Sequence, residues 1–139
     1  MPGCRSGIFK MGHSVASNYR IAIVEDDESL RLALVSLMRC VGHEATSFES
    51  AEQFLAADGA SDSDCVITDI NLQGLSGIEL TERLRAAGHN VPVIAMTARS
   101  DAGLEQKALA SGADCFLKKP FEMDQLVACI DSVLSTGER

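Results

Sequence analysis

Short apolar runs alternate with helical patterns from residue 20 to the end of the chain. Continuous apolar runs are typical of strands that are covered on both faces of a sheet. A run that contains more polar residues predicts a strand close to an edge of the sheet. The predicted strands are Ile21–Val24, His43–Phe48 (the weaker one), Cys65–Thr68, Val91–Met96 and Cys115–Leu117.

Helical spacing of apolar residues fills the segments between these strands. The first such stripe runs from Leu30 to Val41 and stops at Gly42, and Ser50 is placed to cap the second helix. The other predicted helices are 51–57, 76 or 77–87, 102–111 and a last one striped from Met123 to Leu134. Strands and helices that alternate in this way predict right-handed crossovers and an α/β fold with a doubly wound parallel sheet.

The first 19 residues differ from the rest of the chain. They contain three glycines and three serines, and they have no acidic residue, no sustained period and no apolar stretch of the kind that a secretory signal needs. We therefore expect a flexible N-terminal lead at 1–19, one domain at 20–136, and a tail or linker start at 137–139.

Composition narrows the class of protein. Hydrophobic residues make up 46% of the 139, which allows a packed core, and 20 acidic against 12 basic residues give a net charge of −8. This charge argues against binding of nucleic acid or of an anionic membrane by the domain itself. Five cysteines, an odd number without a CxxC pair, favour the reducing cytoplasm over a disulfide framework.

The polar residues that end the strands carry the candidate chemistry. In doubly wound sheets the functional crevice lies beyond the carboxyl ends of the strands. The first predicted strand ends in an acidic run at 25–28, the third in Asp69, the fourth in Thr97 and the fifth in two lysines at 118–119. Three carboxylates, a hydroxyl and an ammonium are thus expected at one rim.

An acidic cluster of this kind favours a hard divalent cation such as Mg²⁺, which takes oxygen ligands. Alone, the run at 25–28 is more typical of a solvated turn; Asp69 and Lys119 at neighbouring strand ends reverse that preference. Asp69 then fits a carboxylate nucleophile that accepts a phosphoryl group, although an aspartate at this place can also be an ordinary turn residue. Lys119 would neutralise charge, and Thr97 would donate a hydrogen bond.

Other phosphate chemistries fit poorly. The chain has no GxxxxGK[ST] loop and no GxGxxG after its first strand, which argues against nucleotide binding by those routes. A haloacid-dehalogenase-type phosphatase would have a second aspartate where Asn71 stands. The histidines at 13, 43 and 89 lie away from the predicted rim.

Four segments, IVEDDESLR, VITDINLQGLSGIEL, VIAMTA and FLKKPF, resemble the signatures of the response-regulator receiver domain of two-component signalling. The resemblance covers residues 20 to about 135 in the order of that family, and LKKPFEMDQL is similar to receivers of nitrogen-fixation-type transcription regulators. It implies a flavodoxin-like fold with strand order 2-1-3-4-5, phosphorylation within a phosphorelay, and a cytoplasmic location.

The resemblance implies roles for individual residues. Asp69 would be the phosphoacceptor, and Mg²⁺ would be bound by Asp26, by Asp69, by the backbone carbonyl of Asn71 and, through water, by Glu25. Many members have Met-Pro where this chain has Leu72-Gln73, and the missing proline predicts a looser loop there.

The switch residues follow from the same resemblance. Thr97 would be the switch hydroxyl and Phe116 the aromatic switch, while Lys119 would precede a cis Pro120. Family precedent makes Asn71 and Arg99 tuners of the phosphoryl lifetime; Arg99 equally fits an exposed loop cation.

The implied function is a switch that takes a phosphoryl group from a histidine kinase or phosphotransfer protein. It would catalyse only its own phosphorylation and dephosphorylation, and it would alter the surface of the fourth helix, fifth strand and fifth helix, where homodimers could form. Output would pass through protein contacts or through a DNA-binding domain missing from the sequence. The alternative is a pseudo-receiver, a binding module that is never phosphorylated.

Overall fold

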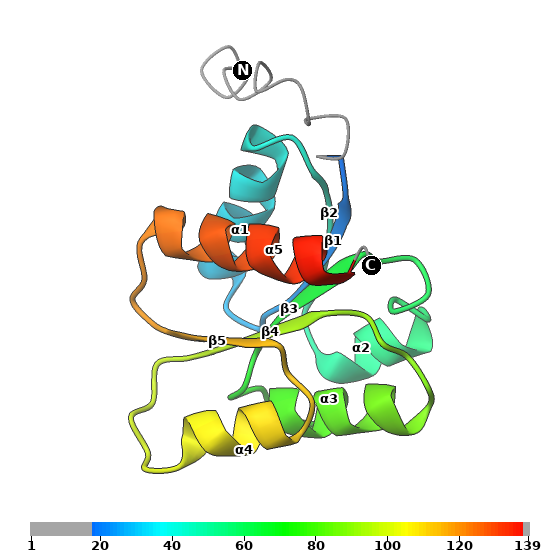
Figure 1. The fold of residues 1–139 in the computed structure, drawn as a ribbon, viewed down its shortest axis with the longest axis vertical. Coiled ribbons are helices and arrows are strands. Elements are labelled where there is room, and N and C mark those ends of the chain that lie inside the picture. Colours follow the sequence, from blue (N-terminus) through cyan, green and yellow to red (C-terminus); the bar gives the residue numbers. More distant parts are fainter. Residues whose placement is uncertain (1–17, 138–139) are drawn as a thin grey trace.

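A five-stranded parallel sheet forms the centre of the computed structural model, which describes residues 18–137 (Figure 1). The strands lie in the order β2-β1-β3-β4-β5, and each neighbouring pair is parallel. Residues 1–17 of the expected lead and residues 138–139 lie outside the described part. The strands are β1 (Arg20–Val24), β2 (Glu44–Phe48), β3 (Cys65–Asp69), β4 (Val93–Thr97) and β5 (Cys115–Lys118).

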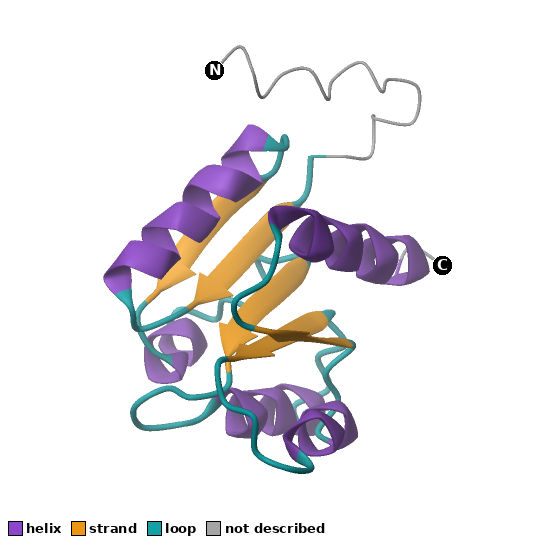
Figure 2. Ribbon diagram, turned by 90° about the vertical axis from the view of Figure 1, so that its left-hand side faces the viewer, coloured by secondary structure: helices purple, strands orange, loops and turns teal. Residues whose placement is uncertain are grey.

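Helices cover both faces of the sheet, α1 and α5 on one side and α2, α3 and α4 on the other (Figures 1 and 2). Each face has its own apolar cluster. In β1, for example, Ile21 and Ile23 belong to the cluster under α1 and α5, and Ala22 and Val24 belong to the other. The helices are α1 (Glu28–Cys40), α2 (Ala51–Ala56), α3 (Gly77–Ala86), α4 (Leu104–Ala110) and α5 (Met123–Gly137).

Side-chain caps fix the starts of three helices. Asp27 accepts a hydrogen bond from the Leu30 amide at the start of α1, and Ser50 does the same for Gln53 in α2. Ser76 and Glu79 form a complete capping box at α3. Each cap satisfies amide groups that have no partner within the helix. These caps hold the segments that follow β1 and β3 at the edge of the sheet where the polar residues gather.

The predicted architecture and strand order are confirmed; several element boundaries differ by one residue, and the starts of β4 and α4 differ by two. β4 begins at Val93 rather than Val91, because Pro92 has no amide hydrogen to donate to the ladder of a strand that is paired on both sides. α4 begins at Leu104 rather than at 102, because Gly103 before it has a left-handed backbone with φ of 81°. The bond between Lys119 and Pro120 is cis, as expected.

The end of the N-terminal lead, the cysteines and the absence of a membrane helix were further expectations from the sequence. Tyr19, the last residue of the expected lead, packs against the core and lies 5.8 Å from the ring of His43, centroid to centroid. Cys65, Cys115 and Cys129 are free thiols. Within residues 18–137 no helix has the length and apolar character that crossing a membrane requires.

Candidate functional site

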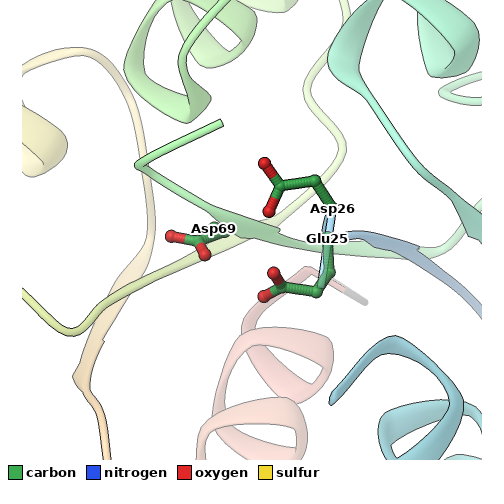
Figure 3. A group of neighbouring side chains, drawn as sticks. All are labelled: Glu25, Asp26 and Asp69. Carbon is green, nitrogen blue, oxygen red and sulfur yellow. The ribbon is translucent and has the colours of Figure 1, made fainter. Parts of the chain in front are cut away.

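Three carboxylates meet where β1 and β3 end, at the carboxyl edge of the sheet (Figure 3). Glu25 and Asp26 follow β1, Asp69 is the last residue of β3, and each side chain offers one oxygen within 4.8 Å of the other two. Glu25 and Asp69 are buried, whereas Asp26 is exposed. The rim predicted from the strand ends therefore exists for these three residues.

Lys119 joins two of these carboxylates. Its ammonium lies 2.8 Å from Asp69 Oδ2 and 3.1 Å from Glu25 Oε1. The residue directly follows β5, and its amide donates to the carbonyl of Thr97 at 2.8 Å, which fixes it beside β4. Burial alone would lower the pKa of Lys119, but the hydrogen bonds and charges of Asp69 and Glu25 outweigh it and raise that pKa above its usual value.

Glu25 has partners on both of its carboxylate oxygens. Oε2 accepts from the Asp27 amide at 3.0 Å, and Oε1 faces Lys119. Burial raises the pKa of Glu25, the Asp27 hydrogen bond opposes this, and the charge of Asp69 adds to the rise. Because both oxygens are already used, the carboxylate of Asp26 is the more accessible metal ligand of the two. The role of Glu25 as a ligand through water stays a prediction.

Asp69 is held from three sides. Its Oδ1 accepts the Asn71 amide at 2.9 Å, and its Oδ2 faces Lys119. A Cβ at Gly77, the first residue of α3, would lie 2.3 Å from the Asp69 carbonyl oxygen and 2.9 Å from the Ile70 Cα. Only a glycine allows α3 to begin this close to the backbone of Asp69.

Thr97, at the end of β4, is fully buried and faces Asn71. Its hydroxyl donates to Asn71 Oδ1 at 2.5 Å and accepts from the Arg99 amide at 3.0 Å. The structure thus brings Thr97 to the rim through the residue that lies two positions after Asp69.

Phe116 and Arg99 lie farther out. Phe116 is half-buried in β5, packs against the cluster on the α3 and α4 side, and lines a cavity of about 360 Å³ whose wall also includes Arg99 and Lys118. The Arg99 guanidinium pairs with Asp101 at 3.0 Å, and both side chains are more than half exposed. Arg99 is therefore an exposed loop cation in this structure. The switch role of Phe116 and the tuning role of Arg99 stay predictions.

Sequence reasoning missed two residues that support the site. Arg31 in α1 is buried and donates to the carbonyl of Glu25 at 3.0 Å, and Glu52 in α2 accepts the Leu75 amide at 2.9 Å. Arg31 was detectable, because it stands three residues before Leu34 on the buried face of the helix. Glu52 had no such signal, since its partner is a backbone group 23 residues away.

The donor set fits a magnesium ion. All three side chains offer carboxylate oxygens, the ligand type that Mg²⁺ prefers. With all three ionised and Lys119 protonated, two negative charges remain in excess, which one divalent cation neutralises. The exposure of Asp26 leaves room for the waters that Mg²⁺ usually retains. That the backbone carbonyl of Asn71 is a further Mg²⁺ ligand stays a prediction.

Comparison with known proteins places this geometry in context. Residues 21–131 match the family described as response regulator receiver domain. The transcriptional regulatory protein FixJ of Bradyrhizobium diazoefficiens is 37% identical over 118 residues, which are 85% of this chain and 58% of FixJ. The DNA-binding transcriptional regulator NtrC of Klebsiella pneumoniae is 35% identical over 81% of the chain and 24% of NtrC.

Solved structures show the same similarity. Full-length FixJ from B. japonicum superposes with a TM-score of 0.80 at 37% identity, covering 86% of this chain and 59% of that one. A structure described as FixJ-N gives 0.77 at 31% identity over 85% and 94% of the two chains. The chain therefore spans little more than half of FixJ, and it covers nearly all of the FixJ-N structure.

Proposed function

The chain belongs to the response regulator receiver domain family of two-component signalling, and from this premise we propose that Asp69 is the phosphoacceptor of a signalling switch. Receiver domains interact with histidine kinases or phosphotransfer proteins, and this chain would receive its phosphoryl group from one of these. The observation that carries the proposal is the buried Asp69 carboxylate, paired with Lys119 at 2.8 Å beside a cluster of acidic oxygens.

The proposed reaction moves a phosphoryl group from a histidine ring nitrogen to a carboxylate oxygen of Asp69. The new P–O bond forms as the P–N bond breaks, and the electron pair of the broken bond stays on the histidine nitrogen. Attack by water on the aspartyl phosphate later returns the free carboxylate and inorganic phosphate. The chain would assist only these two reactions on itself, and its purpose is switching rather than turnover.

The residues of the site have separate tasks in this proposal. Lys119, already 2.8 Å from Asp69 Oδ2, would shift to an oxygen of the transferred group and stabilise its charge. Thr97 would donate its hydroxyl proton to another phosphoryl oxygen. Asp26, Asp69, the Asn71 carbonyl and, through water, Glu25 would hold Mg²⁺, which would supply further charge neutralisation and orientation.

The output would pass through the surface formed by α4, β5 and α5. Movement of Thr97 toward the phosphoryl group would free space for Phe116, and the changed surface would favour a different partner or a second copy of the chain. The relatives FixJ and NtrC are named as transcription regulators, so an attached DNA-binding domain is one route of output and protein contact alone is the other. A cytoplasmic location is part of this proposal.

The test uses acetyl phosphate as phosphoryl donor, with intact-mass measurement of the protein. We expect one added phosphoryl group with Mg²⁺ and none with EDTA, none in Asp69→Asn, and a normal adduct in Asp62→Asn, which changes an exposed aspartate of the loop before β3. If the adduct still formed in Asp69→Asn, the assignment of Asp69 as the phosphoacceptor would be wrong. No adduct together with no beryllofluoride complex would favour the alternative, a binding module that is never phosphorylated.

A further inference from the structure

We propose that Arg31 is a positioning residue for the metal site, and that it acts by holding the peptide group between Glu25 and Asp26. This inference rests on the proposed function, because it concerns the Mg²⁺ that the phosphoryl transfer requires. Arg31 lies in the first turns of α1 and is buried, with 9% of its surface exposed. A buried guanidinium needs partners, and the nearer partner of this one is the backbone of Glu25, a member of the acidic cluster.

The contact of Arg31 is with the backbone rather than with a carboxylate. Its Nη1 donates to the carbonyl oxygen of Glu25 at 3.0 Å, and both atoms are buried. The second contact, from Nη2 to Glu49 at 3.8 Å, involves a carboxylate that is 66% exposed and is therefore screened by water. The buried hydrogen bond to the Glu25 carbonyl is thus the stronger of the two polar contacts that Arg31 makes.

That carbonyl controls where Asp26 lies. The peptide bond is planar, so the Glu25 carbonyl, the Asp26 amide and the Asp26 Cα form one rigid unit. Figure 3 shows the side chains of Glu25 and Asp26 one above the other, both extending from this unit to the side of the chain where Asp69 lies. Asp26 is exposed, and burial therefore does not fix its side chain. Its direction depends on the backbone that Arg31 holds.

Other contacts hold the remaining sides of the same segment. The Glu25 amide donates to the Phe48 carbonyl at 3.1 Å, and the Asp27 amide donates to Glu25 Oε2 at 3.0 Å. Arg31 supplies the contact on the carbonyl between these two amides. Without Arg31, the hydrogen bonds of the Glu25 and Asp27 amides would remain, but the peptide group between Glu25 and Asp26 would lose the hydrogen bond to its carbonyl oxygen.

Positioning and charge make opposite predictions, which allows a decisive test. A positive group near an acidic site repels Mg²⁺, so loss of the Arg31 charge alone would strengthen metal binding. Loss of a positioning contact would weaken it, and outer contacts of this kind change metal affinity by about tenfold or more. The direction of the change in Mg²⁺ affinity therefore separates the two explanations.

The experiment is a Mg²⁺ titration of the unphosphorylated chain, followed by the amide shifts of Glu25 and Asp26 in NMR spectra that also report folding. Arg31→Met should raise the Kd for Mg²⁺ by about tenfold. Arg31→Lys keeps the charge on a stem too short for the same contact and should raise the Kd by about threefold or more. Arg39→Met, an exposed arginine in the last turn of the same helix, is the control and should leave the Kd unchanged.

The outcomes separate this inference from the proposed function. Unchanged or tighter Mg²⁺ binding in Arg31→Met overturns the inference. If that variant does not fold, an unchanged Kd in Arg31→Lys overturns it, because charge and helix packing are retained there. If the unaltered chain binds no Mg²⁺, the proposed function itself fails.

Discussion

The hydroxyl of Thr97 donates its hydrogen bond to Asn71 Oδ1 at a distance of 2.5 Å. A hydroxyl has one proton to donate, and the Arg99 amide already occupies an acceptor position of the same oxygen at 3.0 Å. Donation to a phosphoryl oxygen on Asp69 therefore requires the bond to Asn71 to open. In the proposed function, the side chain of Asn71 would therefore compete with the phosphoryl group for the proton of Thr97.

Removing this competitor should favour the active arrangement. A hydrogen bond between neutral groups has a net strength of about 1 kcal/mol, so Asn71→Ala is expected to tighten beryllofluoride binding about fivefold. The measurement is a beryllofluoride titration in the presence of Mg²⁺. Asn90→Ala, at an exposed position before β4, is the control. Unchanged or weaker binding in Asn71→Ala would show that the hydrogen bond does not oppose the switch.

Thr97 should also contribute to stability through its hydroxyl. Thr97→Val keeps the shape of the buried side chain but leaves Asn71 Oδ1 and the Arg99 amide without this partner, at an expected cost of about 1–3 kcal/mol in the free energy of unfolding. Thr97→Ser keeps the hydroxyl and should lose less. Urea unfolding measures both variants, and a Thr97→Val variant as stable as the original chain would contradict the expectation.

Loss of Lys119 should make stability depend on pH. In Lys119→Met the carboxylates of Glu25 and Asp69 face each other without their cation, which raises the pKa of Glu25 further above 4.5. A raised pKa in the folded state means that the protonated form is stabilised by folding. The stability from this group is fully present below pH 4.5 and is lost as the pH rises through the folded-state pKa.

Urea unfolding of Lys119→Met between pH 4.5 and 8 should therefore show decreasing stability as the pH rises. The original chain should show a smaller dependence in this range, since Lys119 stays charged throughout. Adding Glu25→Gln to Lys119→Met removes the titrating group and should flatten the curve. A curve that keeps its slope in the double variant would assign the dependence to another residue.

Gly77 should tolerate no side chain. In Gly77→Ala the added Cβ would collide with backbone atoms of Asp69 and Ile70, which cannot move aside as the end of a flexible side chain can. We expect a loss of about 1–3 kcal/mol in stability and slower phosphorylation, because α3 and the end of β3 must separate. Thermal unfolding and the rate of phosphorylation by acetyl phosphate test this, and normal values for both would refute the close approach.

The loop between β3 and α3 should respond to acid. The hydrogen bond from the Leu75 amide lowers the pKa of Glu52 below 4.5, so the contact is present above pH 4.5 and is lost as the pH falls through the folded-state value. In an NMR titration the amide shift of Leu75 should change with a midpoint below 4.5. Glu52→Gln should abolish the transition, and a transition that persists would belong to another carboxyl group.

The sequence was informative where backbone direction alone decides the position of a residue. Parallel strands end at one edge, so Glu25, Asp69 and Lys119 could be brought together from their places after apolar runs. Side-chain hydrogen bonds were not predictable in this way, because the bond between Thr97 and Asn71 depends on rotamers set by the packed structure.

Boundaries and loops were also harder to predict than the strands themselves. The apolar pattern includes Val91, but Pro92 lacks the amide hydrogen that a strand paired on both sides needs, so β4 begins at Val93. The expected loosening at Leu72 and Gln73 took no account of the contact between Glu52 and the Leu75 amide, which ties the same loop to α2. The second effect arises from a contact between segments far apart in the chain.

The bridge that Lys119 makes between Glu25 and Asp69 has a consequence for the speed of signalling. Both ion pairs are formed by the chain alone, so under the proposed function Lys119 would not have to be brought to Asp69 anew for each phosphorylation event. In the proposed function, this preformed bridge would leave Lys119 beside Asp69 before a phosphoryl donor arrives.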